Sequence, residues 1–174
     1  MKISTLKWRN KIKTYILPII TLLFLIPTKS EANEQRYSFG LGMGSIYSGI
    51  GSNFAIISDK DMKYISIGCI EYSSNNGAEC GLGLGWVNTD LFSPDNNKHG
   101  LGLYISMVGH ESNTIKVNGN FETEENDIYG LGVSYTYFFN GIGNSGMNIG
   151  ISSHLTNADY KDNYGGFLQI GYQF

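Results

Sequence analysis

Hydrophobic and polar residues alternate over most of the chain, and the alternation is clearest over residues 165–174. Every second residue there is apolar, namely Leu168, Ile170, Tyr172 and Phe174. A period of two is the pattern of a β-strand, because successive side chains point to opposite faces. No helical period persists over residues 33–174, so the chain is expected to fold as an all-β protein.

Seven earlier segments carry the same alternation. In each of them one face holds aliphatic or aromatic residues, and the other holds mostly Gly, Ser, Asn or Thr. These segments are about 37–44, 52–58, 63–69, 81–86, 101–108, 129–137 and 147–152. The segment 52–58 is the weakest, since Ile57 interrupts its polar face. With the last strand, the pattern predicts eight strands.

The residues opposite the apolar face favour a membrane barrel over a soluble sandwich. A sandwich would expose that face to water and carry Lys, Glu and Thr there, whereas this chain carries Gly. The interior of an eight-stranded barrel has room only for side chains, so inward glycines make space for Tyr104 and Phe167. An even number of strands of about ten residues suits a single-chain barrel. The prediction is an eight-stranded antiparallel up-and-down transmembrane β-barrel.

The lengths of the connections support this topology. With both chain ends in the periplasm, the outward connections are 45–51, 72–79, 111–127 and 156–164. The inner turns are 59–61, 89–99 and 140–145. Short inner turns and longer outer loops are typical of such barrels. An aromatic girdle is expected near the inner rim, formed by Tyr37, Trp86, Tyr137, Phe138, Phe139 and Phe174.

The first 32 residues have the pattern of a secretory signal peptide. Residues 1–15 contain five Lys or Arg and no acid, and an apolar run follows over 16–27. Ser30-Glu31-Ala32 then places small residues at the first and third positions of a cleavage site. A membrane helix would need about 20 apolar residues, which exceeds this run. The sequence therefore predicts a signal peptide over 1–32 and a barrel domain over 33–174.

Cleavage after Ala32 would change the charge of the protein. The signal segment holds six of the twelve Lys and Arg residues and one of the fifteen Asp and Glu residues. The remaining chain then has six bases and fourteen acids, a net charge of −8. Such an acidic protein is not expected to bind nucleic acid through the phosphate backbone.

Cys69 and Cys80 are the only two cysteines, and they flank the second outward connection. If they are directly opposed, Ile67 faces Leu82 and Ile65 faces Leu84, and all these residues belong to the apolar face. An oxidising periplasm and an even cysteine count favour a disulfide. We predict a Cys69–Cys80 bond that stabilises the fold by roughly 2–3 kcal/mol. The alternative is two small apolar residues in the wall.

The terminal aromatic residue carries a resemblance to a known group of proteins. The strand with Leu168, Ile170, Tyr172 and Phe174 resembles the last strand of bacterial outer-membrane barrels. The whole of 33–174 resembles the small barrels of the OmpA/OmpX-like type. This resemblance implies location in the outer membrane of a Gram-negative bacterium, among its lipid and lipopolysaccharide. It also implies that the last strand is a signal for the barrel-assembly machinery.

A second resemblance concerns catalysis. His154-Leu155-Thr156-Asn157 is similar to the His-x-Ser-Asn motif of outer-membrane lipid A deacylases, with Thr156 in place of the serine. The acid would come from Asp159 or Asp162. His110-Glu111-Ser112-Asn113 fits the literal motif but lies two strands earlier. The alternation predicts that both histidines point inward, whereas an enzyme acting on membrane lipid needs them to face the lipid.

The outward connection 111–127 has the densest charge, with Glu122, Glu124, Glu125 and Asp127 against Lys116. It is expected to be a solvated, flexible loop, or else a surface for a partner or for weakly bound divalent cations. We expect a non-enzymatic barrel without cofactor or dedicated metal site, which is structural or interacts through its outer loops with an unidentified ligand. The alternative is a lipid A-modifying acyl hydrolase using His154 and Thr156. A pore is disfavoured because the barrel should be filled.

Overall fold

A computed structural model describes residues 35–73, 77–91, 96–117, 120–160 and 162–174, without the side chains of 72–73, 115–117, 120–122 and 124. The predicted signal peptide over 1–32 lies outside these ranges, and the division into 1–32 and 33–174 stays a prediction. No helix in the described ranges is long and apolar enough to cross a membrane.

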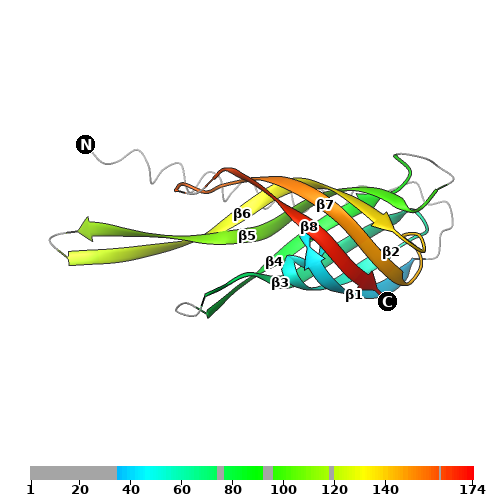
Figure 1. The fold of residues 1–174 in the computed structure, drawn as a ribbon, viewed down its shortest axis with the longest axis horizontal. Coiled ribbons are helices and arrows are strands. Elements are labelled where there is room, and N and C mark those ends of the chain that lie inside the picture. Colours follow the sequence, from blue (N-terminus) through cyan, green and yellow to red (C-terminus); the bar gives the residue numbers. More distant parts are fainter. Residues whose placement is uncertain (1–34, 74–76, 92–95, 118–119, 161) are drawn as a thin grey trace. The chain divides into compact units, whose positions relative to one another are not determined.

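Eight antiparallel strands close into a barrel in the order of the chain, and β1 pairs with β8 (Figure 1). This confirms the predicted all-β, up-and-down fold. The strands are β1 (Arg36–Gly44), β2 (Gly49–Ile57), β3 (Asp61–Ser73), β4 (Gly77–Asn88), β5 (His99–Val117), β6 (Asn120–Phe138), β7 (Gly146–Thr156) and β8 (Tyr164–Gln173). The weak second segment is a full strand, and Ile57 points inward at its end, 5% exposed.

The two faces of each strand are sorted as the alternation predicts. In β8, Leu168 is 80% exposed on the outside of the barrel, whereas the adjacent Gln169 is 5% exposed and points inward. Ile170, Tyr172 and Phe174 are exposed in the same way as Leu168. Apolar side chains therefore cover the outer wall, and the interior holds small and polar residues together with a buried hydrophobic cluster.

The ladder between β3 and β4 has the predicted register. Cys69 lies opposite Cys80, Ile67 opposite Leu82 and Ile65 opposite Leu84. A disulfide joins Cys69 to Cys80, so the predicted bond is present. Beyond it a bulge displaces Ile70, and the ladder resumes with Glu71 opposite Glu79.

The prediction that residues 45–51 form an outward connection is wrong, because the segment turns into the barrel. Residues Ser45–Tyr47 form a short 3-10 helix, η1, that folds into the barrel, and all three are buried. Gly44 and Gly49 have φ of 112° and 96°, and Ser48 is left-handed with φ of 54°, so this segment makes two tight reversals. A Cβ on Gly171 would lie 2.3 Å from Tyr47 Oη. The Tyr47 ring therefore packs directly on the backbone of the wall, where a larger residue than glycine would clash with it.

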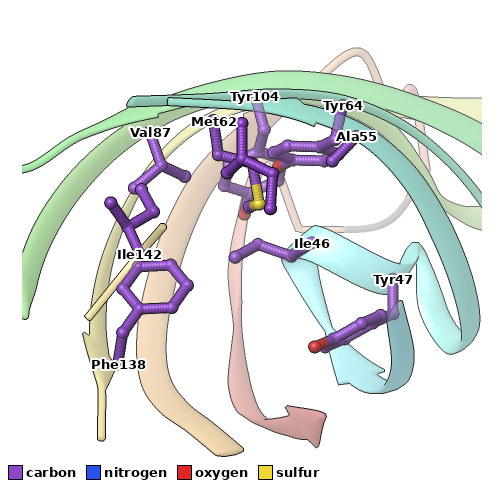
Figure 2. Close-up of a cluster of buried hydrophobic side chains, with 10 residues drawn as sticks. Ile46, Tyr47, Ala55, Met62, Tyr64, Val87, Tyr104, Phe138 and Ile142 are labelled. Atoms are coloured by element: carbon purple, nitrogen blue, oxygen red, sulfur yellow. The ribbon is translucent and has the colours of Figure 1, made fainter. Parts of the chain in front are cut away.

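The buried hydrophobic cluster is built around this inward segment. Figure 2 shows Ile46 and Tyr47 inside the ring of strands, with Tyr104 among the side chains that extend from the wall. Phe138 belongs to the same cluster and is only 3% exposed, so its assignment to the aromatic girdle is wrong. It lies opposite Asn148 on the inward face of the ladder, and it packs in the cluster that includes Ile142. Among the remaining residues predicted for the girdle, Tyr37, Phe139 and Phe174 are exposed.

Polar side chains complete the interior through hydrogen bonds to one another. Gln173 Nε2 donates to Ser38 Oγ at 2.7 Å and to Asn53 Oδ1 at 3.0 Å. Asn148 Nδ2 donates to Tyr47 Oη at 2.7 Å, and Asn148 Oδ1 accepts from Gln169 Nε2 at 3.1 Å. Because buried polar groups are costly without partners, these contacts fix the interior side chains in place.

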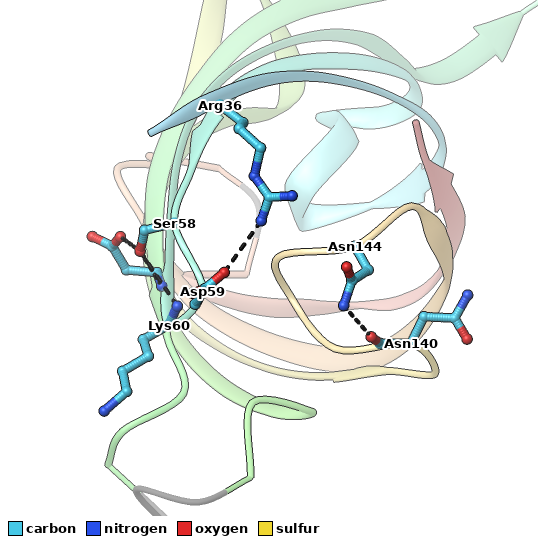
Figure 3. A network of polar contacts seen from close by, with 7 residues as sticks. Arg36, Ser58, Asp59, Lys60, Asn140 and Asn144 are labelled. Carbon is cyan, nitrogen blue, oxygen red and sulfur yellow. Dashed lines mark hydrogen bonds and ion pairs between the residues drawn. The ribbon is translucent and has the colours of Figure 1, made fainter. Parts of the chain in front are cut away.

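The connections that follow β2, β4 and β6 lie at the end of the barrel near Phe174, which we call the turn end. Arg36 Nη2 contacts Asp59 Oδ1 at 3.2 Å, and Asn144 Nδ2 donates to the Asn140 carbonyl oxygen at 2.9 Å (Figure 3). The three turns lie where the sequence predicts them, since β2, β4 and β6 end at Ile57, Asn88 and Phe138.

At the opposite end, which we call the hairpin end, two predicted loops are largely strand. The expected loop 111–127 is a paired hairpin, because β5 and β6 continue together to Val117 and Asn120 (Figure 1). The connection 72–79 is likewise strand up to Ser73 and from Gly77. Both are antiparallel ladders, whose strands need no crossover connection and can stay paired close to the turn. The connection 156–164 is confirmed between β7 and β8.

Candidate functional site at the hairpin end of the barrel

A cavity of about 810 Å³ lies at the hairpin end, and we call it the mouth cavity. Its lining comes from β3, β5, β6, β7, β8 and the connection between β7 and β8. The lining residues are Ile70, Glu71, Val108, Gly109, Ile128, His154, Thr156, Asp159, Tyr160, Asp162, Tyr164, Gly165, Gly166 and Phe167. This volume lies in the range of small-molecule sites.

His154 points inward, as the alternation predicts, and is 7% exposed. Its Nδ1 is hydrogen-bonded to the Tyr104 hydroxyl at 2.8 Å, and that hydroxyl lies 3.2 Å from Ser152 Oγ. The ring of Phe167 lies beside the His154 imidazole, with 5.2 Å between centroids. His154 is therefore held at the base of the mouth cavity by a tyrosine and an aromatic neighbour.

The residues of the hypothetical hydrolase gather at this cavity but do not form a triad. His154, Thr156, Asp159 and Asp162 all line it. Thr156 Oγ1 donates to the Asp162 carbonyl oxygen at 3.1 Å, so it closes the turn between β7 and β8. Within the described part of the chain, no hydrogen bond joins His154 to Thr156 or to a carboxylate. A nucleophile needs a base within hydrogen-bond reach, and the base needs an orienting acid.

His110 is not where the alternation places it. A bulge between Met107 and Gly109 shifts the register of β5, so His110 lies opposite Asp127 on a solvent-facing side of the hairpin. Its Nδ1 is 3.3 Å from Asp127 Oδ1. A bulge adds one residue to one strand, and every later side chain then changes face.

The same bulge turns Glu111 inward, where it is 5% exposed. Its carboxylate accepts the backbone N–H of Asp159 at 3.2 Å and that of Tyr160 at 3.0 Å. Glu111 thus anchors the connection between β7 and β8 over the mouth cavity. Sequence reasoning missed this role because nothing in the local pattern marks the bulge.

Carboxylates dominate the charge of the mouth cavity. Glu71, Asp159 and Asp162 line it, and no Lys or Arg appears among its described lining residues. Glu79 lies opposite Glu71 in the ladder and shares its face. Among the residues that the structure describes, no group of three or more His, Cys, Asp or Glu is arranged to hold a metal ion. The acids Glu122 and Glu124, predicted as the charged outer loop, have no described side chains.

At the hairpin end, β1 and β2 stop before their neighbours β8 and β3 do. The β1–β8 ladder ends at Met43 opposite Ile170, and the β2–β3 ladder ends at Ile50 opposite Cys69. Beyond these points, within the described residues, β8 over Tyr164–Gln169 and β3 over Ile70–Ser73 have no partner on that side. The chain between them turns inward as η1. We call this gap in the strand ladder the notch.

These features define the class of this protein as a small, closed, eight-stranded antiparallel β-barrel with a filled interior and a cavity at one mouth. Comparison with models of protein families, with curated proteins and with solved structures found no match to this chain.

Proposed function

We propose that this protein is an integral outer-membrane barrel of a Gram-negative bacterium that acts without catalysis, through the surfaces at its hairpin end. The observation that carries the proposal is the apolar outer wall of a closed barrel. Each of the eight strands exposes at least one large apolar side chain, for example Leu41, Phe54, Ile67, Leu82, Leu103, Leu131, Ile151 and Leu168. A soluble protein rarely exposes so extensive an apolar surface.

The position of the charged residues supports the same proposal. On the outward face of the barrel wall, within the described residues, charge is confined to Asp61 and Lys63 at the start of β3. Asp61 accepts a hydrogen bond from Trp86 Nε1 at 3.3 Å, close to the turn end. Charged side chains facing lipid are costly at the bilayer midplane and tolerated at the interface. A closed barrel also satisfies its backbone groups internally, as a lipid environment requires.

The location can be tested with single cysteines, because Cys69 and Cys80 are bonded to each other. Ser112 is exposed on the β5–β6 hairpin, and Asn144 is exposed at the turn end. In intact cells, a membrane-impermeant maleimide is expected to label Ser112→Cys and to leave Asn144→Cys unlabelled until the outer membrane is permeabilised. Equal labelling of both variants in intact cells, or recovery of the protein in the soluble fraction, would contradict the proposal.

The absence of catalysis is proposed from the surroundings of His154. Its described hydrogen bond is to Tyr104, and its ring packs on Phe167. These contacts give His154 a structural role in the packing of the barrel interior. Mass spectrometry of lipid A is expected to give identical profiles from cells expressing the wild type, His154→Ala or no protein. An acyl chain lost with the wild type and retained with His154→Ala would establish the hydrolase instead.

A further inference from the structure

The Cys69–Cys80 disulfide lies where β3 and β4 lose their other strand neighbours. The β2–β3 ladder ends at Cys69, and the β4–β5 ladder begins at Gly83. Beyond the disulfide, within the described residues, β3 and β4 pair only with each other, over 71–73 and 77–79 (Figure 1). We call this two-stranded extension the ribbon. A two-stranded hairpin by itself is at best marginally stable in water, so the ribbon depends on support at its base.

The ladder of the ribbon contains features that weaken it. A bulge at Ile70 interrupts the pairing directly after the disulfide. Glu71 then lies opposite Glu79, and like charges directly opposed in a ladder are destabilising. Glu79 Oε2 is also buried without a hydrogen-bond partner among the described residues, which raises the free energy of the paired state. The disulfide therefore holds together two strands whose own side chains repel each other.

The disulfide is accessible to a thiol from outside the barrel. Cys80 is exposed and Cys69 is half-buried, whereas a disulfide of the barrel interior would be shielded. Exposed disulfides are the ones that exchange readily with thiols. Because the chain has no further cysteine, the reducing thiol must come from another molecule.

We propose that the Cys69–Cys80 disulfide is a redox-sensitive switch: reduction by a small dithiol separates the ribbon and opens the β3 side of the mouth cavity, while the barrel stays closed. The dithiol gives up two electrons and becomes a cyclic disulfide, and its two protons pass to the sulfur atoms of Cys69 and Cys80. Ile70 and Glu71 line the mouth cavity and flank the notch, so separation of the ribbon removes part of this lining. Access of external thiols in the cell rests on the proposed function. The opening itself does not depend on it.

The first test measures amide hydrogen exchange of the purified protein in an uncharged detergent, with and without dithiothreitol as the dithiol. Exchange at Glu71, Ala78 and Glu79 in the ribbon is expected to rise at least about tenfold on reduction. The reason is that loss of the cross-link restores conformational freedom to the chain between the two cysteines. Exchange at Ile65 and Leu84, which pair on the barrel side of the disulfide, should change little.

The like charges are tested with the double variant Glu71→Gln/Glu79→Gln. In the reduced protein it should slow exchange in the ribbon by about twofold to fivefold, because the repulsion across the ladder is removed. Glu125→Gln is the matched control, since Glu125 is 70% exposed on the β5–β6 hairpin. It should leave exchange in the ribbon unchanged.

Opening of the mouth cavity is followed with an uncharged gadolinium chelate, which broadens the amide NMR signals of residues that it can approach. Val108 and Gly109 line the cavity, and their signals should broaden more strongly in the reduced protein than in the oxidised one. The variant Cys69→Ser/Cys80→Ser should match the reduced wild type in both experiments and should not respond to dithiothreitol.

Three results would overturn the proposal: unchanged exchange in the ribbon on reduction, an equal rise at Ile65 and Leu84, or unchanged broadening at Val108 and Gly109. An equal rise would mean that the disulfide supports the whole barrel and not the ribbon alone. These measurements are independent of where the protein lies in the cell. Failure of the cysteine-labelling experiment would therefore remove the proposed location and leave the switch standing. Unchanged exchange on reduction would remove the switch and leave the location untouched.

Discussion

Replacing Tyr47 with Ala is expected to lower the free energy of unfolding by about 3–5 kcal/mol, the range for loss of a large buried aromatic side chain. Tyr47 is fully buried and lies against the glycines of β1 and β8. The surrounding wall is closed by strand ladders and cannot collapse into the space that the ring leaves. Asn148 Nδ2 would also lose its acceptor, the Tyr47 hydroxyl.

The variant Tyr47→Phe separates the contribution of ring packing to stability from that of the hydroxyl hydrogen bond. It keeps the ring and removes only the hydroxyl, so the expected loss is about 1–3 kcal/mol, the cost of an unsatisfied buried donor. Urea unfolding of both variants, followed by near-ultraviolet circular dichroism, gives the two values. Equal losses in both variants would mean that the hydroxyl, and not the packing of η1, holds the interior together. No loss in either would contradict the inward position of η1.

Replacing Gln173 with Leu is expected to destabilise the closure of the barrel by about 2–4 kcal/mol. Gln173 is 2% exposed and bonds to Ser38 on β1 and to Asn53 on β2. Leucine fills a similar volume but leaves both partners short of a hydrogen bond. The β1–β8 ladder pairs Gly40–Met43 with Ile170–Gln173 and is extended by one backbone hydrogen bond from Phe174 to Phe39. Because this ladder is short, side-chain contacts carry a large share of the seam.

The measurement for Gln173→Leu is amide hydrogen exchange, residue by residue. Faster exchange is expected at Leu41 and Met43, which pair with β8, and little change at the β5–β6 ladder. Tyr172→Phe is the matched control, because Tyr172 is the adjacent outward residue and is 41% exposed. A uniform increase in exchange rate across all strands would show that the β1–β8 seam does not open independently of the rest of the barrel.

The strands, their order and the β3–β4 register could be predicted because a two-residue period depends only on the local sequence. Once one face is apolar, a shift by one residue would turn it to the wrong side, so the register follows. The Cys69–Cys80 bond followed from this argument. The direction of residues 45–47 could not be predicted in the same way. Their burial depends on free space inside the barrel, which exists only after all eight strands have closed.

The mouth cavity was predicted only in part. The inward direction of His154 follows from the alternation, and the sequence offers Asp159 or Asp162 as the acid of a hydrolase; all three line the cavity. Glu71 and Glu111 were missed because each follows a bulge that changes which side chains face inward. The hairpin over 111–127 could not be predicted as strand for a different reason. Its sequence is mostly polar and charged, so it lacks the apolar alternation that identifies the other strands.

The β1–β8 seam has a consequence for how the chain folds. Seven strand pairs join neighbours along the sequence, whereas Ser38 and Gln173 are separated by 135 positions. The entropy of closing so long a loop must be overcome before any contact of the seam is made. Contacts between residues far apart in the sequence slow folding, so we expect this one ladder to limit the folding rate. We expect the hairpins to form early, and closure of the ring between first and last strand to be the slow step of assembly.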